Sequence, residues 1–304
     1  MSSFEQDFDV VRSGAVYLAE LVSHWDIFTP NGGYLAAVAY AAMDAEKALP
    51  IPASFHCHYL RSAVHGACEI AVEALRRSRT AEVLRATLSQ NGKPVLIATA
   101  SLLAENVEGF EHRFADYPAP PRPDALESYD TLAYDIAAEP VYWRNVDMRP
   151  VRFRHTPDPF DPVYQAWLRL KAAELPLSDR AAVARLLLWA DLAPYSSLAA
   201  SIDWANRWVA PNLDLYVQFH ALPKTTPWLL IDGVAPIASR GLVGATTRIW
   251  DEEGRLVATS ASQLICRPNP FYTAKLAWLE AYRKREAEAT TTPRTDETLG
   301  RAEA

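Results

Sequence analysis

Residues 34–48 read YLAAVAYAAMDAEKA, a stretch of small and apolar side chains without a charge before Asp44. A helix that is apolar on every side is normally buried, because no face of it suits water. Small side chains would also let a sheet wrap closely around such a helix. The stretch follows Pro30-Asn31-Gly32-Gly33, a turn and helix-start signal. We therefore predict a central helix enclosed by a sheet.

Strand-like runs surround this helix. One precedes it at residues 15–22, and four follow it at residues 54–61, 68–75, 82–90 and 94–103. The last two are joined by Asn91-Gly92-Lys93, a strong hairpin turn because Asn-Gly tolerates positive φ. The first 105 residues thus predict one helix followed by an antiparallel meander.

The second half of the chain repeats this order. A strand at residues 163–170 is followed by Ser178, which is placed to cap a helix running to about Asp191 through LLLWA. Strands are predicted at residues 212–220, 228–236, 241–250 and 255–266, with a hairpin turn at 251–254. The final hairpins, NGKPVLIATAS (91–101) and EGRLVATSAS (253–262), align with each other. Similarity at this scale indicates a duplication rather than a solenoid.

These patterns divide the chain into four parts. They are a first half (residues 1–105), a proline-rich linker (106–145), a second half (146–283) and a charged, Thr- and Ala-rich tail (284–304) that we expect to be disordered. Joining the two sheets edge to edge would cover one exposed edge of each. We predict a tandem α+β fold in which each half is an antiparallel sheet wrapped around a central helix.

Composition excludes several classes of protein. The chain has 304 residues, of which 50% are apolar and 22% charged, the balance of an ordinary globular protein. A net charge of −7 argues against nucleic acid and anionic membranes as partners. Three cysteines (Cys57, Cys68 and Cys266) make no disulfide framework, and neither a zinc-binding spacing nor a signal peptide or membrane-spanning run is present. We therefore predict a cytoplasmic protein without a metal ion.

Two pairs of residues near the first helix could carry chemistry. Gly32 and Gly33 open the helix, where backbone N–H groups can polarise a carbonyl or hold an oxyanion, although a plain tight turn would use the same residues. His56 and His58 share one face of a strand, but metal ligation needs a third ligand and none is evident in the sequence. An exposed or hydrogen-bonded pair is therefore favoured, and His56 alone could act on a substrate if it pointed inward.

Charged residues supply two further candidates. Asp191 follows the buried run LLLWA, so it either makes a hydrogen bond at the end of a helix or orients a water molecule. Arg76, Arg77 and Arg79 form a basic cluster that is either a solvated turn or a binding site for the phosphates of a ligand. No P-loop, GxGxxG, GxSxG or HExxH pattern is present.

An ordered series of motifs resembles the acyl-CoA thioesterase II family. That family carries SFHxxFLR, QNGKP, TAS and GFEH in this order, and the corresponding runs here are SFH and YLR (54–61), QNGKP (90–94), TAS (99–101) and GFEH (109–112). The resemblance continues at the Gly pair 32–33 and at residues 190–192, 219–220, 239–241 and 254–258, so that it spans about residues 15 to 267. It implies a tandem (double) hotdog fold and hydrolysis of acyl-CoA without a cofactor or a covalent enzyme intermediate.

The resemblance also implies a set of catalytic residues. In the family, an aspartate, a hydroxyl-bearing residue and a glutamine hold the attacking water. The aspartate corresponds to Asp191, and the hydroxyl position falls on Asn212. The glutamine position falls on Ser262 without a gap, or on Gln263 if a bulge shifts the strand by one residue, which would turn the side chain to the other face. Gly33 would then donate to the oxyanion.

The leading hypothesis is therefore an acyl-CoA thioesterase in which Asp191, Asn212 and Gln263 orient the water. We expect a homo-oligomer that takes its substrate from CoA or an acyl carrier protein, with Arg76, Arg77 and Arg79 as candidate phosphate ligands. Two alternatives use the same fold. One is a non-catalytic acyl or acyl-CoA binding protein, and the other is a hotdog hydratase or dehydratase, which would need a paired acid and histidine near the helix.

Overall fold

A computed structural model describes residues 4–113, 116–132, 140–152, 158, 160–202, 206–277, 280–281 and 284. Its strands in chain order are β1 (Val11–Ser13), β2 (Val16–Leu21), β3 (Ile51–Tyr59), β4 (Gly66–Arg77), β5 (Ala81–Gln90), β6 (Lys93–Leu103), β7 (Val146–Pro150), β8 (Val163–Leu170), β9 (Trp208–Val209), β10 (Asp214–Phe219), β11 (Leu229–Ser239), β12 (Leu242–Asp251), β13 (Leu256–Ile265) and β14 (Arg267–Pro268). The helices are η1 (Phe4–Phe8), η2 (Ser23–Trp25), α1 (Gly32–Glu46), η3 (Pro123–Ala125), α2 (Tyr129–Leu132), η5 (Val141–Arg144) and α3 (Asp179–Ala199).

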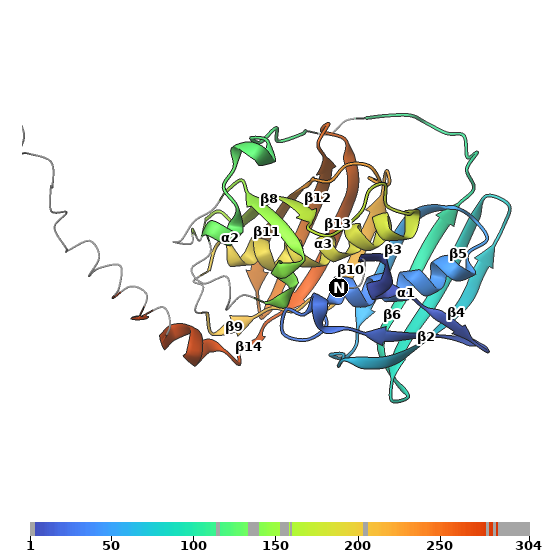
Figure 1. The fold of residues 1–304 in the computed structure, drawn as a ribbon, viewed down its shortest axis with the longest axis horizontal. Helices are drawn as coiled ribbons and strands as arrows, with labels where there is room; N and C mark the ends of the chain where they lie inside the picture. The colour runs from blue at the N-terminus through green and yellow to red at the C-terminus, as the bar shows by residue number, and fades with distance from the viewer. Residues whose placement is uncertain are drawn as a thin grey trace, which may run out of the picture.

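One antiparallel sheet organises the described residues (Figure 1). It has 12 strands in the order β1-β2-β4-β5-β6-β3-β10-β13-β12-β11-β8-β7, and β9 pairs with β14 in a separate ribbon. The strands of the first half end at β3 and those of the second half begin at β10. The two predicted sheets are thus joined edge to edge, which confirms that expectation.

The junction of β3 with β10 is well packed, and we call it the seam. Phe55 pairs with Val217 and Cys57 pairs with Leu215, and all four side chains are completely buried on the inner face. Joining two edge strands satisfies backbone N–H and C=O groups that would otherwise face solvent. The seam therefore links the halves through both hydrogen bonds and apolar packing.

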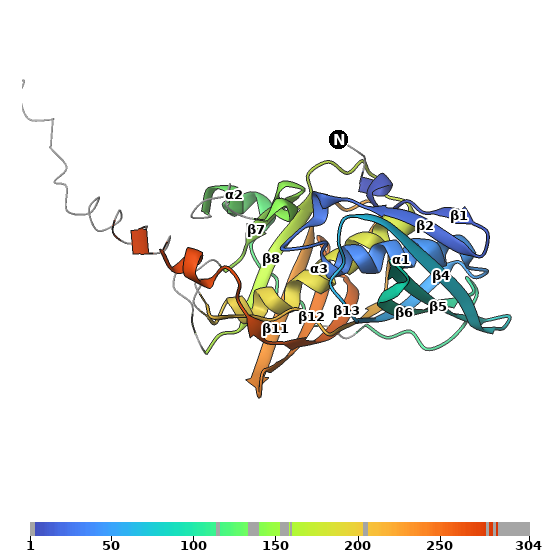
Figure 2. The ribbon, with the colours of Figure 1, turned by 90° about the horizontal axis from the view of Figure 1, so that it is seen from below.

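Two central helices cover the inner face of the sheet (Figure 2). α1 packs on β4, β5 and β6, α3 packs on β8 and on β10 through β13, and the helices contact each other. The side chain of Asn31 caps α1 and that of Ser178 caps α3. Every residue of α1 from Gly33 to Met43 is buried, as the alanine-rich stretch predicts.

The end of α3 was predicted wrongly. The helix does not stop near Asp191 but continues to Ala199, with Pro194 inside it. A polar residue followed by a proline resembles a helix end in sequence. Here the carboxylate is buried and bonded to other elements, and packing of the last turns carries the helix past the proline.

The strands follow the predicted ranges closely. β8 has the predicted bounds, whereas β3 begins at Ile51, three residues before the predicted start. The β5–β6 turn has positive φ at Asn91 (52°) and Gly92 (69°), as the Asn-Gly signal predicts. β7 was missed, because its residues lie at the boundary of the predicted linker.

The linker packs against the second half of the sheet instead of only spanning a gap. Trp167, Leu230 and Trp250 form an apolar cluster against which Tyr117 packs, and Trp167 Nε1 donates to the carbonyl of Pro121 at 2.9 Å. Three short helical segments (η3, α2 and η5) also lie within residues 106–145. The proline-rich segment thus covers apolar side chains of the second half.

Three other expectations concern the whole chain. The three cysteines are free, as expected. Among the described residues, no helix is both long and apolar enough to cross a membrane. Nearly all of the tail that we expected to be disordered, residues 285–304, lies outside the described residues.

Candidate active site

Asp191 lies inside α3 and faces the N-terminus of α1. It is 6% exposed. The two helices approach so closely here that a side chain at either of the first two positions of α1, Gly32 and Gly33, would collide with α3. A Cβ on Gly32 would lie 2.7 Å from Asp191 Oδ1, and one on Gly33 would lie 2.6 Å from the Cα of Leu188. The Gly pair is therefore needed for helix packing and for access to the carboxylate, which a plain tight turn would not require.

Three side chains from separate elements donate hydrogen bonds to the Asp191 carboxylate. Asn31 Nδ2 donates to Oδ2 at 2.9 Å, and Tyr59 Oη and Asn212 Nδ2 donate to Oδ1 at 2.8 and 2.7 Å. Asn212 Nδ2 also lies 2.8 Å from the Asp191 carbonyl. Asn31 precedes α1, Tyr59 ends β3 and Asn212 precedes β10, so both halves of the chain build one site.

Asn31 serves two purposes through its one amide group. Its Oδ1 accepts from the backbone N–H of Tyr34 at 3.2 Å and caps α1, while its Nδ2 points to Asp191. The cap fixes the amide orientation, because its acceptor is committed to the helix. A helix N-terminus also favours a negative charge nearby, so α1 itself stabilises the carboxylate.

Opposing effects set the acidity of Asp191. Burial raises the pKa of the carboxyl group, and the bonds from Asn212, Tyr59, the Gly33 amide and Asn31 lower it, with burial prevailing. Burial and the neighbouring Asp191 raise the pKa of Tyr59 well above its ordinary value, so its hydroxyl stays protonated and donates. The result is an oriented carboxylate that accepts a proton more readily than an exposed one.

The Gly33 amide is not placed as the expected oxyanion donor. It hydrogen-bonds to the carboxylate of Asp191 and thereby lowers the pKa of that group. α1 does begin at Gly32, as predicted, but the N–H of Gly33 at its start is directed to the carboxylate of Asp191.

Ser262 and not Gln263 faces the interior. The strand β13 carries a bulge at Val257, and from Ala258 onward buried and more exposed residues alternate, which places Ser262 inward and Gln263 outward. The side chain of Gln263 lines a hollow on the outer face of the sheet together with Tyr216. The expectation that Gln263 orients the water is therefore wrong, because its side chain lies on the other side of the sheet from Asp191.

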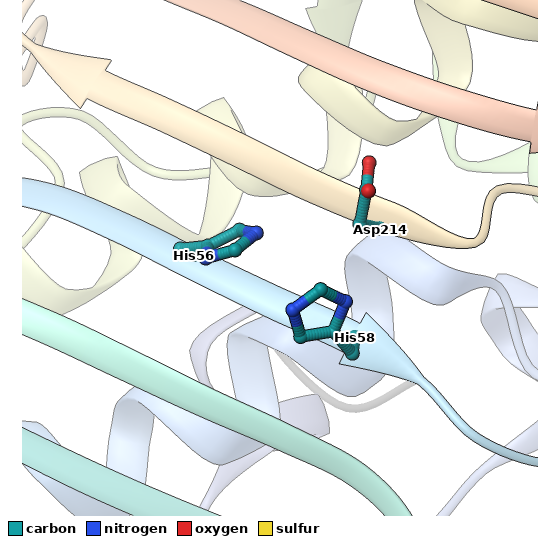
Figure 3. A group of neighbouring side chains, drawn as sticks. All are labelled: His56, His58 and Asp214. Atoms are coloured by element: carbon teal, nitrogen blue, oxygen red, sulfur yellow. The ribbon is translucent and has the colours of Figure 1, made fainter.

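His56 also faces outward, which corrects the expectation of a substrate contact. Phe55 and Cys57 on either side of it are buried, whereas His56 is half-buried and packs edge-on against His58 and Tyr216. Figure 3 shows both imidazoles beside Asp214, an acidic residue that was not among the candidates predicted from the sequence. Its closeness depends on the pairing of β3 with β10, for which no local signal exists.

The arginine cluster lies far from Asp191. Arg76, Arg77 and Arg79 lie at the β4–β5 turn, beside the part of the sheet where Ala81 and Ile51 both pair with Leu103. Tyr59 is eight residues along β3 from Ile51, which corresponds to about 26 Å. Arg77 is in addition bonded to Glu82 at 2.8 Å. The structure thus does not bring this cluster to the site.

Sequence reasoning missed Asn31 and Tyr59. Asn31 was visible only as part of a turn, although an Asn before a helix is a common cap. Tyr59 stands where the motif SFHxxFLR has phenylalanine. Its hydroxyl group at a position that is apolar in the motif was the signal that could have indicated a polar role.

Several polar atoms beneath the sheet have no partner among the described residues. They include Asn212 Oδ1, Ser260 Oγ and Ser262 Oγ, all buried. Buried polar atoms are nearly always hydrogen-bonded, so each of these atoms is a candidate contact for water or substrate. Asn212 Oδ1 belongs to the amide that already donates to Asp191.

Two helices wrapped by one duplicated sheet define a double-hotdog protein, and the buried carboxylate at the helix crossing gives it a candidate catalytic group. The sequence matches the family described as "Acyl-CoA thioesterase N-terminal domain" over residues 21–103 and "Acyl-CoA thioesterase C-terminal domain" over residues 114–266. The chain belongs to the acyl-CoA thioesterase family.

Individual relatives agree with this assignment. The chain is 24% identical over 246 residues to human acyl-coenzyme A thioesterase 8, covering 71% of this chain and 73% of the relative. A putative thioesterase II from Thermobifida fusca has a similar structure, with a TM-score of 0.72, 26% identity and coverage of 88% and 98% of the two chains. Acyl-CoA thioesterase II TesB2 from Mycobacterium marinum gives a TM-score of 0.72 at 22% identity, with 89% and 100% covered, and supports the fold.

Proposed function

We propose that this protein hydrolyses acyl-CoA thioesters to the free acid and CoA by direct attack of water. The observation that carries the proposal is the Asp191 carboxylate, buried where α1 and α3 cross and held by donors from both halves. Hydrolysis by water needs one base with fixed orientation, and positioning supplies much of the remaining rate.

The reaction assigns a task to each group. The water oxygen attacks the thioester carbonyl carbon while one of its protons passes to Asp191. Asn212 Oδ1, a buried acceptor for which the described residues offer no partner, takes a hydrogen bond from the same water and orients it. The carbon–sulfur bond then breaks, the electron pair leaves with the CoA sulfur, and the proton on Asp191 is returned to that thiolate.

Ser262 would occupy the position that the family gives to glutamine. Its hydroxyl is buried, faces the helices and lacks a partner among the described residues. A serine reaches less far than a glutamine, so we infer that it contacts the water or the carbonyl oxygen from a shorter distance. Gln263 has no part in this mechanism.

Release of free CoA tests the proposal. We expect release from at least one member of a panel of acyl-CoAs, and a decrease in kcat on the order of 10²- to 10⁴-fold in Asp191→Asn, the contribution typical of a general base. Asp251→Asn is the matched control, because Asp251 is also buried but bonds its own hairpin turn. Release that is equal in Asp191→Asn and wild type would contradict the mechanism.

The same assay tests the first alternative, and the donors to Asp191 bear on the second. A non-catalytic acyl-CoA binding protein would release no CoA from any member of the panel. A hydratase or dehydratase pairs its acid with a histidine, and the donors to Asp191 found among the described residues are two asparagines, a tyrosine and a backbone amide. This arrangement favours hydrolysis.

Delivery and assembly remain predictions. Comparing an acyl-CoA with the same acyl group on a carrier protein would separate the two carriers. Light scattering in solution would measure the expected homo-oligomer.

A further inference from the structure

Three ligand-type side chains meet on the outer face of the seam, on the side of the sheet away from Asp191. They are His56 and His58 of β3 and Asp214 of β10 (Figure 3). One nitrogen atom of each imidazole and one carboxylate oxygen lie within 4.8 Å of one another. The proposed hydrolysis does not use this cluster, so it needs an explanation of its own.

Strand geometry explains why the three side chains gather. Residues two apart on a strand share a face, so His56 and His58 point the same way, and Tyr59, at the next position, points inward to Asp191. Asp214 pairs directly with His58 across the seam. Each half of the chain therefore contributes to the cluster, and the contacts exist only when the halves are joined.

The imidazoles are free to act as ligands. Within the part of the chain that the structure describes, neither ring makes a hydrogen bond, and the rings pack edge-to-face with centroids 4.7 Å apart.

The carboxylate is held by a second layer of contacts. The backbone N–H of Gln263 donates to Asp214 Oδ1 at 2.8 Å, while Oδ2 accepts no bond from any residue that the structure describes. Outer hydrogen bonds of this kind fix the orientation of metal-ligating carboxylates. The backbone bond to Oδ1 thus fixes the orientation of the carboxylate, and Oδ2 is available to bind a metal ion.

We propose that His56, His58 and Asp214 bind a divalent transition-metal ion of the zinc class that joins the two halves of the sheet. Two imidazoles and a carboxylate suit zinc, whose bonds to these atoms are about 2.0 to 2.2 Å. In a tetrahedral zinc site the ligand atoms would be about 3.4 Å apart. The three atoms here lie within 4.8 Å of one another, so small rotations of the side chains would bring them to this spacing. The remaining positions open to solvent and take water.

Metal titration of the untagged full-length chain tests the site. The protein is stripped with EDTA, titrated with zinc sulfate in a calorimeter, and titrated separately with cobalt(II) to record visible absorption. We expect one zinc ion per chain. Zinc should also raise the thermal unfolding midpoint, because the ion links the two strands of the seam and binds only the folded protein.

Three variants locate the binding. His58→Ala and Asp214→Asn each remove one ligand, and each should weaken zinc binding by at least about 10- to 100-fold, the loss that even an outer-shell change causes. His65→Ala is the matched control, because His65 also contacts a carboxylate, Asp26 at 2.8 Å, but belongs to no group of three ligand-type side chains among the described residues. His65→Ala should bind zinc like the wild type.

Folding is checked on the metal-free variants by their unfolding midpoints. The proposal would be overturned if the wild type bound no zinc, or if wild type, His58→Ala and Asp214→Asn bound zinc with equal affinity. A thiolate-to-cobalt charge-transfer band would also overturn it, since it would assign the metal to a cysteine. Loss of binding in both ligand variants with retention in His65→Ala would support it.

Discussion

A carboxylate inside a protein loses the water that would solvate its charge, and donors must replace that water. At Asp191 these donors come from a helix cap, a strand end and the segment before another strand: Asn31, Tyr59 and Asn212. The compensation is incomplete, so the pKa of the carboxyl group remains raised. A group with this balance can hold a charge and still accept a proton during catalysis.

The pH dependence of hydrolysis should report the raised pKa of Asp191. Only the ionised carboxylate accepts a proton from water, so kcat/KM should fall as the pH falls through the pKa of Asp191 in the folded protein. Because that pKa is raised by burial, the acidic limb should lie above the ordinary value of 3.8. A pH profile of kcat/KM checks this, and a limb at the pKa of an exposed aspartate would be inconsistent with it.

Removing the Tyr59 hydroxyl should slow hydrolysis and move its pH profile. Tyr59→Phe deletes a bond that lowers the pKa of Asp191, so the acidic limb should shift to higher pH. At neutral pH, kcat/KM should decrease on the order of tenfold, the low end for a hydrogen bond to a charged group. Tyr17→Phe is the control, since Tyr17 donates to Glu46 at the same distance of 2.8 Å elsewhere. Equal profiles for the two variants would exclude a role for Tyr59.

Neighbouring substitutions on β13 distinguish the inward from the outward side chain. Ser262→Ala should lower kcat/KM by roughly fivefold, as expected for one hydrogen bond. Gln263→Ala should retain wild-type activity, because its side chain lies on the outer face and its backbone N–H, which orients Asp214, is kept. The opposite ranking would mean that β13 adopts the shifted register.

At the scale of elements, local signals predicted most of the fold. The alanine-rich run predicted α1, and Asn91-Gly92 predicted the hairpin that their positive φ angles form. The end of α3 escaped prediction, because Pro194 resembles a stop signal and only packing overrides it.

The site was harder to predict than the fold, because its contacts join distant residues. Tyr59 and Asp191 are 132 positions apart, and Asn31 and Asp191 are 160 apart. Asp191 was predicted because it follows the apolar run LLLWA, and Asn212 because of the resemblance to the acyl-CoA thioesterase II family. The choice between Ser262 and Gln263 depended on a bulge that leaves no mark in the sequence. Asp214 needed the strand order at the seam.

The crossing of α1 and α3 should tolerate no added methyl group. In Gly33→Ala the new Cβ would lie 2.6 Å from the backbone of Leu188, which cannot move without shifting α3. Overpacking of this kind should lower the free energy of unfolding by about 1 to 3 kcal/mol, measured by urea denaturation. Gly109→Ala, where nothing lies within 4 Å, should have little effect. Equal losses in both variants would show that the crossing is not the cause.

At the scale of the whole molecule, the two halves share one sheet and one helix layer. The seam and the α1–α3 contact both have to break before either half can unfold alone. We therefore expect a single transition in differential scanning calorimetry, with equal calorimetric and van't Hoff enthalpies. Two resolved transitions would mean that the seam is weaker than its packing suggests.

The unequal contents of the two central helices have a consequence for the number of reactions that one chain can carry out. The buried span of α1, from Gly33 to Met43, carries no charged side chain, whereas α3 carries Asp191. The first half supplies Asn31 and Tyr59 as donors, and the second supplies Asp191 and Asn212. In the proposed mechanism the duplicated halves therefore build one catalytic centre between them instead of one each, because neither half alone holds the complete set of side chains.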